Sequence, residues 1–499
     1  MRILTLLTSL SLSLLLNAQS PTFEWAQSMG SSGGEFGMNV ATDSSGNIYS
    51  IGFFSNNVDF DPGSGTTNLS SNGGFDIYIQ KLDPNGNLIW VKSIGGANND
   101  QGTAITTDAS GNVYTTGSFV GTVDFDPGPG TTIPTSPGGV FLMKMDPLGN
   151  LLWVKTADAG QGTSITIDAT DNVYIAGIFS GINKDFDPGP GSTLLSSAGY
   201  DDVFVMKMDT SGSFIWAKSF GGNNDDYIYY NSIVVDNSGT VYTTGRFKYS
   251  ADFDPGPGIT NLSSVGNYDI FIHKMDSSGN FLWAKTFGGT GGNDIARSIA
   301  LDPFGNVYTT GGVTAGTIDF DPGPGSAILT SSSGAIYIHR IDASGSFLWV
   351  KMIGGGGNGQ GTSITIDASG YAYTTGLYQG TIDFDPGAGT TNLTSVGGYD
   401  IFIHKMDALG NSLWAKTFGG TGNDNGRCTF IDRAKNIYTI GEFESTVDFD
   451  PGTGVFNLSS NGGKDIFIQK ISQCLPINIS EIQSACNGYT WPADGNTYN

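Results

Sequence analysis

The sequence is poor in cysteine, histidine and basic residues. It has only 3 Cys and 3 His in 499 residues, and 22 Lys and Arg face 46 Asp and Glu, a net charge of −24. Three cysteines are too few for a disulfide scaffold, although Cys474 and Cys486 could pair in an oxidising compartment. Cys428 is predicted to be a small packed side chain. The acidic surface argues against nucleic acid or an anionic membrane as a partner, because both carry negative charge.

Long apolar runs are absent after the first residues. Residues 1–18 have the pattern of a secretory signal, with Arg2 as a positive start, the apolar stretch Ile3–Leu16, and Ala18 before a cleavage site. No later stretch approaches the length that crosses a bilayer. We therefore expect a secreted or cell-surface protein whose mature chain does not insert into a membrane.

An internal repeat dominates the rest of the sequence. The motif Asp-Phe-Asp-Pro-Gly occurs seven times at intervals of 61 to 67 residues. Runs resembling Asn-Val-Tyr-Thr-Thr-Gly, Leu-Trp-Ala-Lys and Asp-Ile-Phe-Ile-His-Lys each recur seven times in step with it. A fixed period of this kind indicates a repeat architecture rather than several unrelated domains.

Each repeat predicts four short strands. The runs alternate and are rich in β-branched residues, whereas no segment after the signal has convincing helical periodicity. Two turns of the form Asp-x-x-Gly-Asn join strands in each repeat, with Asp capping a type I turn and Gly in the left-handed position. We therefore expect an all-β protein in which these aspartates form turns.

The two ends of the repeat region are complementary. The mature chain begins with a lone strand around Trp25, and the last repeat ends at Lys470 without its Trp strand. Pairing the two would close a ring and remove an edge strand at each end. The sequence thus predicts a seven-bladed β-propeller of four-stranded blades, closed by the N-terminal Trp strand. An open β-solenoid is the alternative, but it would not use complementary half-repeats.

The repeat resembles a known family. The segments Ser298–Gly311 and Asp400–Lys416 are similar to the bacterial β-propeller repeat called SBBP, and the resemblance extends over about residues 23–472. The tail around Cys486 resembles modules of secreted Bacteroidetes surface proteins, which often carry a type IX secretion sorting domain. The residues and the resemblance together predict a signal peptide at 1–18, a propeller at 19–472, and at 473–499 the start of a C-terminal module or linker that is truncated. It supplies no catalytic residues.

The Asp-Phe-Asp-Pro-Gly motif is the candidate metal site. Its two aspartates are two residues apart, so in an extended segment they point the same way, and paired carboxylates with loop carbonyls suit calcium. The favoured interpretation is structural, with Phe as an anchor and the aspartates capping loop amides. The calcium candidates are Asp59, Asp61, Asp124, Asp126, Asp185, Asp187, Asp252, Asp254, Asp319, Asp321, Asp383, Asp385, Asp448 and Asp450.

Other polar residues are weaker candidates. The three histidines share one strand position with Gln and Met, which favours packing and argues against Ser–His–Asp or Cys–His catalysis. The Trp row is expected to pack between blades rather than to bind carbohydrate. The arginines of the mature chain are expected to be scattered without repeat register, and the departure at Asp225–Tyr230 to be loop variation. These arginines are Arg246, Arg297, Arg340, Arg427 and Arg433.

We therefore expect a non-enzymatic binding or structural module for a protein, glycan or matrix ligand. It should be a monomeric propeller within a longer protein, and its long loops should share one face. The alternative is a metal-assisted lyase or hydrolase on that acidic loop face.

Overall fold

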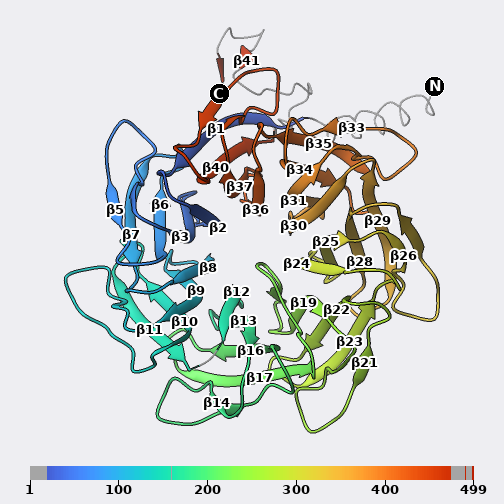
Figure 1. Cartoon of the computed structure of the whole chain (residues 1–499), viewed down its shortest axis with the longest axis horizontal. Helices are drawn as coiled ribbons and strands as arrows, with labels where there is room; N and C mark the ends of the chain where they lie inside the picture. The colour runs from blue at the N-terminus through green and yellow to red at the C-terminus, as the bar shows by residue number, and fades with distance from the viewer. Residues whose placement is uncertain (1–19, 159, 474–488, 491–496, 499) are drawn as a thin grey trace.

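A computed structural model describes residues 20–158, 160–473, 489–490 and 497–498. Among these residues there is no helix, and seven four-stranded antiparallel sheets surround a central axis (Figure 1). The predicted all-β, seven-bladed propeller is therefore confirmed. The predicted signal peptide and the possible Cys474–Cys486 pair lie outside the described residues.

The four strands of each blade are named A to D from the centre outwards. Blade 1 contains β2 (Glu35–Thr42), β3 (Ile48–Phe54), β6 (Asp76–Leu82) and β7 (Leu88–Ile94). Blade 2 contains β8 (Gln101–Thr107), β9 (Val113–Val120), β10 (Gly138–Met145) and β11 (Leu151–Ala157). Blade 3 contains β12 (Gln161–Ile167), β13 (Val173–Phe179), β16 (Asp202–Met208) and β17 (Phe214–Gly222). Blade 4 contains β18 (Ile233–Val235), β19 (Val241–Phe247), β22 (Asp269–Met275) and β23 (Phe281–Phe287).

The remaining blades follow the same order. Blade 5 contains β24 (Ile295–Leu301), β25 (Val307–Val313), β28 (Ala335–Ile341) and β29 (Phe347–Gly355). Blade 6 contains β30 (Asn358–Ile366), β31 (Ala372–Gln379), β34 (Asp400–Met406) and β35 (Ser412–Phe418). Blade 7 contains β36 (Asn425–Ile431), β37 (Ile437–Phe443), β40 (Asp465–Ser472) and β1 (Thr22–Met29).

Short two-stranded hairpins extend the connection between strands B and C around the outside of the ring (Figure 1). They are β4 (Asn57–Asp59) with β5 (Asn68–Ser70), β14 (Lys184–Asp185) with β15 (Leu194–Leu195), β20 (Ser250–Asp252) with β21 (Asn261–Ser263), β26 (Gly316–Asp319) with β27 (Ile328–Ser331), β32 (Thr381–Asp383) with β33 (Asn392–Thr394), and β38 (Thr446–Asp448) with β39 (Asn457–Ser459). A separate hairpin pairs β41 (Tyr489–Thr490) with β42 (Thr497–Tyr498).

The two ends of the ring close on each other. β1 pairs antiparallel with β40, in a register that runs from Thr22 opposite Ser472 to Met29 opposite Ile466. The N-terminal strand is therefore the outermost strand of blade 7, as predicted. Closure removes the open edges that a linear array of blades would expose.

The burial pattern explains the strand sequences. Strands B and C lie between neighbouring blades, and both β3 and β6 are buried along their whole length. Strand D lies at the rim, so β7 is only partly buried. Because strands B and C are covered on both faces, they bury polar residues such as Ser50 and Gln80 as well as their apolar ones.

Alternate connections lie on opposite faces of the ring. The A–B and C–D turns have the predicted Asp-x-x-Gly-Asn geometry. In one of them Asp276 Oδ1 accepts the amides of Ser278 and Asn280 at 2.8 and 2.9 Å, and Gly279 has φ +79°. We call this side the turn face. The B–C and D–A connections lie on the other side, the loop face.

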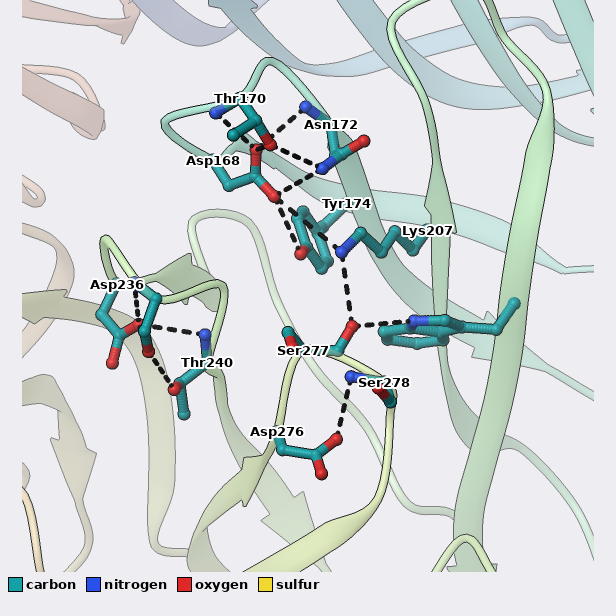
Figure 2. A network of polar contacts seen from close by, with 12 residues as sticks. Asp168, Thr170, Asn172, Tyr174, Lys207, Asp236, Thr240, Asp276, Ser277 and Ser278 are labelled. Carbon is teal, nitrogen blue, oxygen red and sulfur yellow. Dashed lines mark hydrogen bonds and ion pairs between the residues drawn. The ribbon is translucent and has the colours of Figure 1, made fainter.

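Neighbouring blades are joined by a repeated polar contact near the turn face. Lys207 Nζ lies 3.9 Å from Asp168 Oδ2 and 3.3 Å from the carbonyl oxygen of Ser277 in the next blade (Figure 2). The same carbonyl accepts the indole N–H of Trp216 at 3.2 Å. Equivalent Trp-to-turn bonds form from Trp25, Trp90 and Trp349. These indoles bridge blades, in agreement with the packing interpretation of the Trp row.

Candidate functional site

The fourteen candidate calcium ligands form seven separate and nearly identical pairs. In each, Oδ1 of the first Asp accepts the amide of the second Asp at 3.0–3.1 Å and an amide eight residues on at 2.8–2.9 Å. Oδ1 of the second Asp accepts the amide of the motif Gly at 2.7–2.8 Å. Both carboxylates therefore act as caps for loop amides. Within the described residues, no three Asp, Glu, His or Cys side chains form a group that could hold a metal ion.

The motif also joins neighbouring blades. Its Phe is buried in every repeat, with at most 1 % exposed. Asp252, its first residue in blade 4, lies opposite Gly221 at the end of β17 in blade 3, and Asp383 lies opposite Gly354 in the same way. The Gly residues at the end of strand D allow this close approach of two backbones. These contacts give the Asp-Phe-Asp-Pro-Gly motif and the glycines at the end of strand D a structural role at the blade junction.

The histidines and the described cysteine are packed in the interior. His273, His339 and His404 have no exposed surface, and burial lowers the pKa of each to about 3. His273 Nε2 lies 2.9 Å from the carbonyl oxygen of Phe253, the position at which Gln80 Nε2 bonds the carbonyl of Phe60. Cys428 is buried, and burial raises the pKa of its thiol.

The sevenfold repeat is broken at the loop-face end of the central channel. In strand A of blade 2, Asp100 precedes Ala104 by four residues, whereas in blade 4 the equivalent Asp226 precedes Ser232 by six. The two additional residues fall in the segment that contains Tyr229 and Tyr230, between the Tyr227–Arg246 bridge and β18.

This insertion reaches across the centre of the ring. The connection between β17 and β18 runs inwards (Figure 1), and Asn231 within it has φ +61°. Asn231 Oδ1 accepts the side-chain N–H of Asn39, in blade 1, at 2.6 Å. Its carbonyl oxygen accepts the amide of Ile299, in blade 5, at 3.1 Å. Asn231 of blade 4 therefore contacts blade 1, across the channel, as well as the neighbouring blade 5.

Three arginines gather at this end of the channel. Arg297 and Arg427 occupy the bulged position of strand A in blades 5 and 7, where blades 2, 3 and 6 have Thr103, Thr163 and Thr362. Arg246, from strand B of blade 4, is the third. The expectation of scattered arginines without repeat register was wrong for these three, because the ring brings different blades to one axis.

Aromatic rings cover the guanidinium groups. Arg246 Cζ lies 4.3 Å from the ring centroid of Tyr268 and 5.5 Å from those of Tyr227 and Tyr229. Arg297 Cζ lies 4.5 Å from the centroid of Tyr229. The ring of Tyr229 is thus shared by two cations, in a geometry that favours cation–π attraction. The departure at Asp225–Tyr230 is therefore part of a polar cluster, not simple loop variation.

Arg427 differs from the other two because it has a carboxylate partner. Its Nε lies 3.1 and 3.0 Å from the two oxygens of Glu442, a fully buried side chain that also lies 3.8 Å from Lys464 Nζ. Burial lowers the pKa of Arg427, but Glu442 more than offsets this effect. Burial also lowers the pKa of Arg297, and the positive charges of Arg427 and Arg246 act in the same direction.

Pairs of buried acidic side chains lie between neighbouring blades. At five of the seven junctions, the Asp that begins strand C is close to the acid at the start of the next strand A, and none of the ten is more than 3 % exposed. Burial is the largest cause that raises the pKa of these carboxyls, to about 7 for Asp202 and Asp226. The pairs are Asp76 with Asp100, Asp202 with Asp226, Asp269 with Asp294, Asp400 with Asp424, and Asp465 with Glu35.

Two cavities lie along the channel. One of about 290 Å³ lies in its middle, with Asn39, Asn231 and Cys428 in its lining. The other, of about 490 Å³, opens at the turn face beside Asp236, Asp302 and Asp367. Those three aspartates cap their own turns, as Asp302 does by accepting the amides of residues 304 and 306 at 2.9 Å. The asymmetric polar groups therefore lie at the loop-face end.

The fold defines a seven-bladed β-propeller with one asymmetric channel mouth. Residues 89–118 and 282–311 match the family model described as SBBP, Beta-propeller repeat. Each match runs from strand D of one blade through strands A and B of the next, which supports the resemblance seen in the sequence.

Relatives with curated descriptions are much longer. The chain is 26 % identical over 501 aligned residues to the uncharacterized WD repeat-containing protein L264 of Acanthamoeba polyphaga mimivirus, covering 84 % of this chain and 36 % of that protein. It is 27 % identical over 194 residues to the regulatory protein FlaEY of Caulobacter vibrioides, covering 38 % and 19 %. The chain therefore spans about a third and a fifth of these two proteins.

Among solved structures, a gluconolactonase from Xanthomonas campestris aligns over 92 % of both chains, with 9 % identity and a TM-score of 0.32. Among the described residues, no helix is long and apolar enough to cross a membrane.

Proposed function

We propose that the protein is a non-enzymatic binding module, secreted or displayed on the cell surface, and that its ligand binds at the loop-face mouth of the central channel. The observation that carries this proposal is the break in sevenfold symmetry there. The insertion at Tyr229 and Tyr230 and the two strand-A arginines, Arg297 and Arg427, place unlike polar side chains around one axis. Elsewhere the polar residues repeat from blade to blade and bond the chain's own backbone.

Other features support binding rather than catalysis. The histidines are buried and held neutral, and Cys428 is buried with a raised thiol pKa. The motif and turn carboxylates already accept backbone amides, so they are caps rather than free acids or bases. A rigid, interlocked ring with side chains that meet at one loop-lined mouth is a common setting for a binding site. Secretion rests on the pattern of residues 1–18.

The test is to remove the feature that breaks the symmetry. Deletion of Tyr229 and Tyr230 restores the four-residue spacing of the other blades, so the ring should still fold. The full chain without its signal is applied to arrays of extracellular glycans and peptides, beside the deletion variant and Arg433→Ala. Arg433 is exposed on the turn face, where blades 2, 3 and 6 have Ala109, Ala169 and Ala368.

Loss of ligand binding in the deletion variant, with binding kept by Arg433→Ala, supports the proposal. Binding that survives the deletion places the ligand elsewhere and overturns it. Cleavage of a bound glycan, detected as new chain ends, would instead favour the alternative of a hydrolase or lyase.

A further inference from the structure

Two guanidinium groups at the channel mouth lack a carboxylate partner, although acidic residues outnumber basic ones about twofold. Among the described residues, neither Arg246 nor Arg297 lies within ion-pair distance of an acid. Nε of each is buried and has no hydrogen-bond partner. A buried unsatisfied donor costs about 1–3 kcal/mol, and more when it is charged. A ligand that accepts these hydrogen bonds would recover this free energy.

The chemistry of these groups favours a planar anion. A Tyr ring packs against each guanidinium group, through the 4.3 Å contact of Arg246 with Tyr268 and the 4.5 Å contact of Arg297 with Tyr229. A cation–π contact is not a hydrogen bond to an acceptor, so it does not satisfy the N–H donors of the guanidinium group. Carboxylates match this donor pattern, often in a bidentate manner.

The cationic groups also repel one another. The charges of Arg427 and Arg246 act on Arg297, and Glu442 neutralises only Arg427 among the three. An anion placed between Arg246 and Arg297 would remove this repulsion. Glu442 is buried and already bonded to Arg427 and Asn425, so it does not fill that place.

Neutral hydrogen-bonding groups lie at the same end of strand A in other blades. Two residues before the bulged Thr, blades 2, 3 and 6 have Gln101, Gln161 and Gln360, each half-buried. Gln161 Nε2 donates to Gln101 Oε1 at a long 3.3 Å. Tyr230 follows Tyr229 in the same insertion, and the charges of Arg427 and Arg297 act to lower its pKa against the larger opposite effect of burial. Amides and phenols can both donate to and accept from the hydroxyl groups of a sugar.

We propose that the channel mouth binds an acidic sugar, with Arg246 and Arg297 holding its carboxylate and with Tyr229, Tyr230 and the strand-A glutamines contacting its ring and hydroxyl groups. This inference rests on the proposed binding function and names its ligand class. It treats the tyrosine-rich insertion and the unpaired arginines as parts of one site.

The experiment measures binding to the full chain without its signal by isothermal titration calorimetry. Glucuronic acid is compared with glucose, which has a neutral hydroxymethyl group in place of the carboxylate, and with acetate and sulfate, which lack the sugar ring. Glucuronic acid should bind and glucose should not, and acetate or sulfate should bind at least tenfold more weakly. If glucose binds as tightly as glucuronic acid, the proposed role of the arginines is wrong. If acetate or sulfate binds as tightly, the proposed contacts with the sugar ring are wrong.

Two variants with the same change in charge locate the site. Arg297→Thr introduces the residue that three other blades have at this position, and Arg433→Ala removes an exposed arginine from the turn face. Arg297→Thr should weaken glucuronic acid binding at least tenfold, whereas Arg433→Ala should leave it unchanged. Equal loss in both variants would indicate non-specific charge attraction and would contradict the proposal. Circular dichroism of both variants verifies the fold.

The proposed function and the ligand class fail in different ways. One outcome is that glucuronic acid does not bind but deletion of Tyr229 and Tyr230 abolishes binding of another array ligand. The proposed ligand class is then wrong, whereas the proposed binding site is supported. If the deletion affects no ligand, both are wrong. Tyr230→Phe adds a finer test, because it removes one hydroxyl and should weaken glucuronic acid binding without abolishing it.

Discussion

The acid pair between blades 3 and 4 predicts that one neutralising substitution will stabilise the protein at alkaline pH. Asp202 Oδ2 accepts the amide of Ala198 at 2.9 Å, while its buried Oδ1 has no hydrogen-bond partner. Asp226 lies close enough to interact, and the charges of Asp201 and Asp225 act in the same unfavourable direction. Asp202→Asn should retain the bond to Ala198 and remove the charge.

The magnitude follows from the raised pKa. Burial raises the pKa of Asp202 from 3.8 to about 7, so the folded state holds a proton that the unfolded chain releases. A raised pKa contributes stability that is fully present below about pH 4 and is lost as pH rises through 7. Between pH 5 and pH 8 the contribution of Asp202 falls by ~3 kcal/mol, and Asp226 titrates in the variant as well as in the wild type. Asp202→Asn cannot lose this contribution.

Urea unfolding followed by tryptophan fluorescence at pH 5, 6.5 and 8 measures the effect. The unfolding free energy of the wild type should fall more steeply with pH than that of Asp202→Asn, by ~3 kcal/mol across this range. Asp158→Asn is the matched control, since Asp158 is exposed and its pH profile should follow the wild type. Identical profiles for wild type and Asp202→Asn, or a variant less stable at pH 8, would refute the assignment of a retained proton.

Three further predictions concern the scaffold. Trp216→Phe removes the hydrogen bond to the carbonyl of Ser277, so the free energy of unfolding in urea should fall by ~1 kcal/mol. An unchanged free energy would contradict a stabilising role for this contact between blades. Removal of residues 20–30 takes away β1 and opens an edge of blade 7. The truncated chain should associate in light scattering, and a monomer as stable as the full chain would contradict ring closure. A chelator should leave the melting temperature unchanged, because Asp319 and its equivalents already accept amides. A fall of several degrees, with calcium found by elemental analysis, would assign calcium to the motif.

Sequence reasoning was most successful where a structural rule is local or periodic. The Asp-x-x-Gly-Asn turns depend on contacts within five residues, so their geometry could be predicted from one copy. The closure of the ring followed from the lone strand at Trp25 and the missing partner after Lys470. The burial of the histidines followed from their alternation with Met at one strand position.

The candidate site was missed because it depends on the ring as a whole. Arg246, Arg297 and Arg427 are far apart in the chain and approach only when blades 4, 5 and 7 surround one axis. One sequence signal could have found part of it. Ser298 and Cys428 align as equivalent residues, so the arginine before each has the same position in its repeat. The departure at Asp225–Tyr230 was visible in the sequence, but it was interpreted as loop variation because its neighbours across the ring could not be predicted.

Acidic and basic residues are distributed differently around the ring, and this difference bears on which anions could reach the channel mouth. Most acids recur with the repeat, so their field is spread around the ring and repels anions from most directions. Arg246, Arg297 and Arg427 depart from the repeat and are concentrated at one mouth, where the proposed anion would gain hydrogen bonds and relieve the repulsion between cations. A long polyanion would still extend over the acidic rim, whereas one acidic residue at the end of a neutral chain would meet only the mouth. The net charge of −24 therefore narrows the expected ligand to a small or terminal acid.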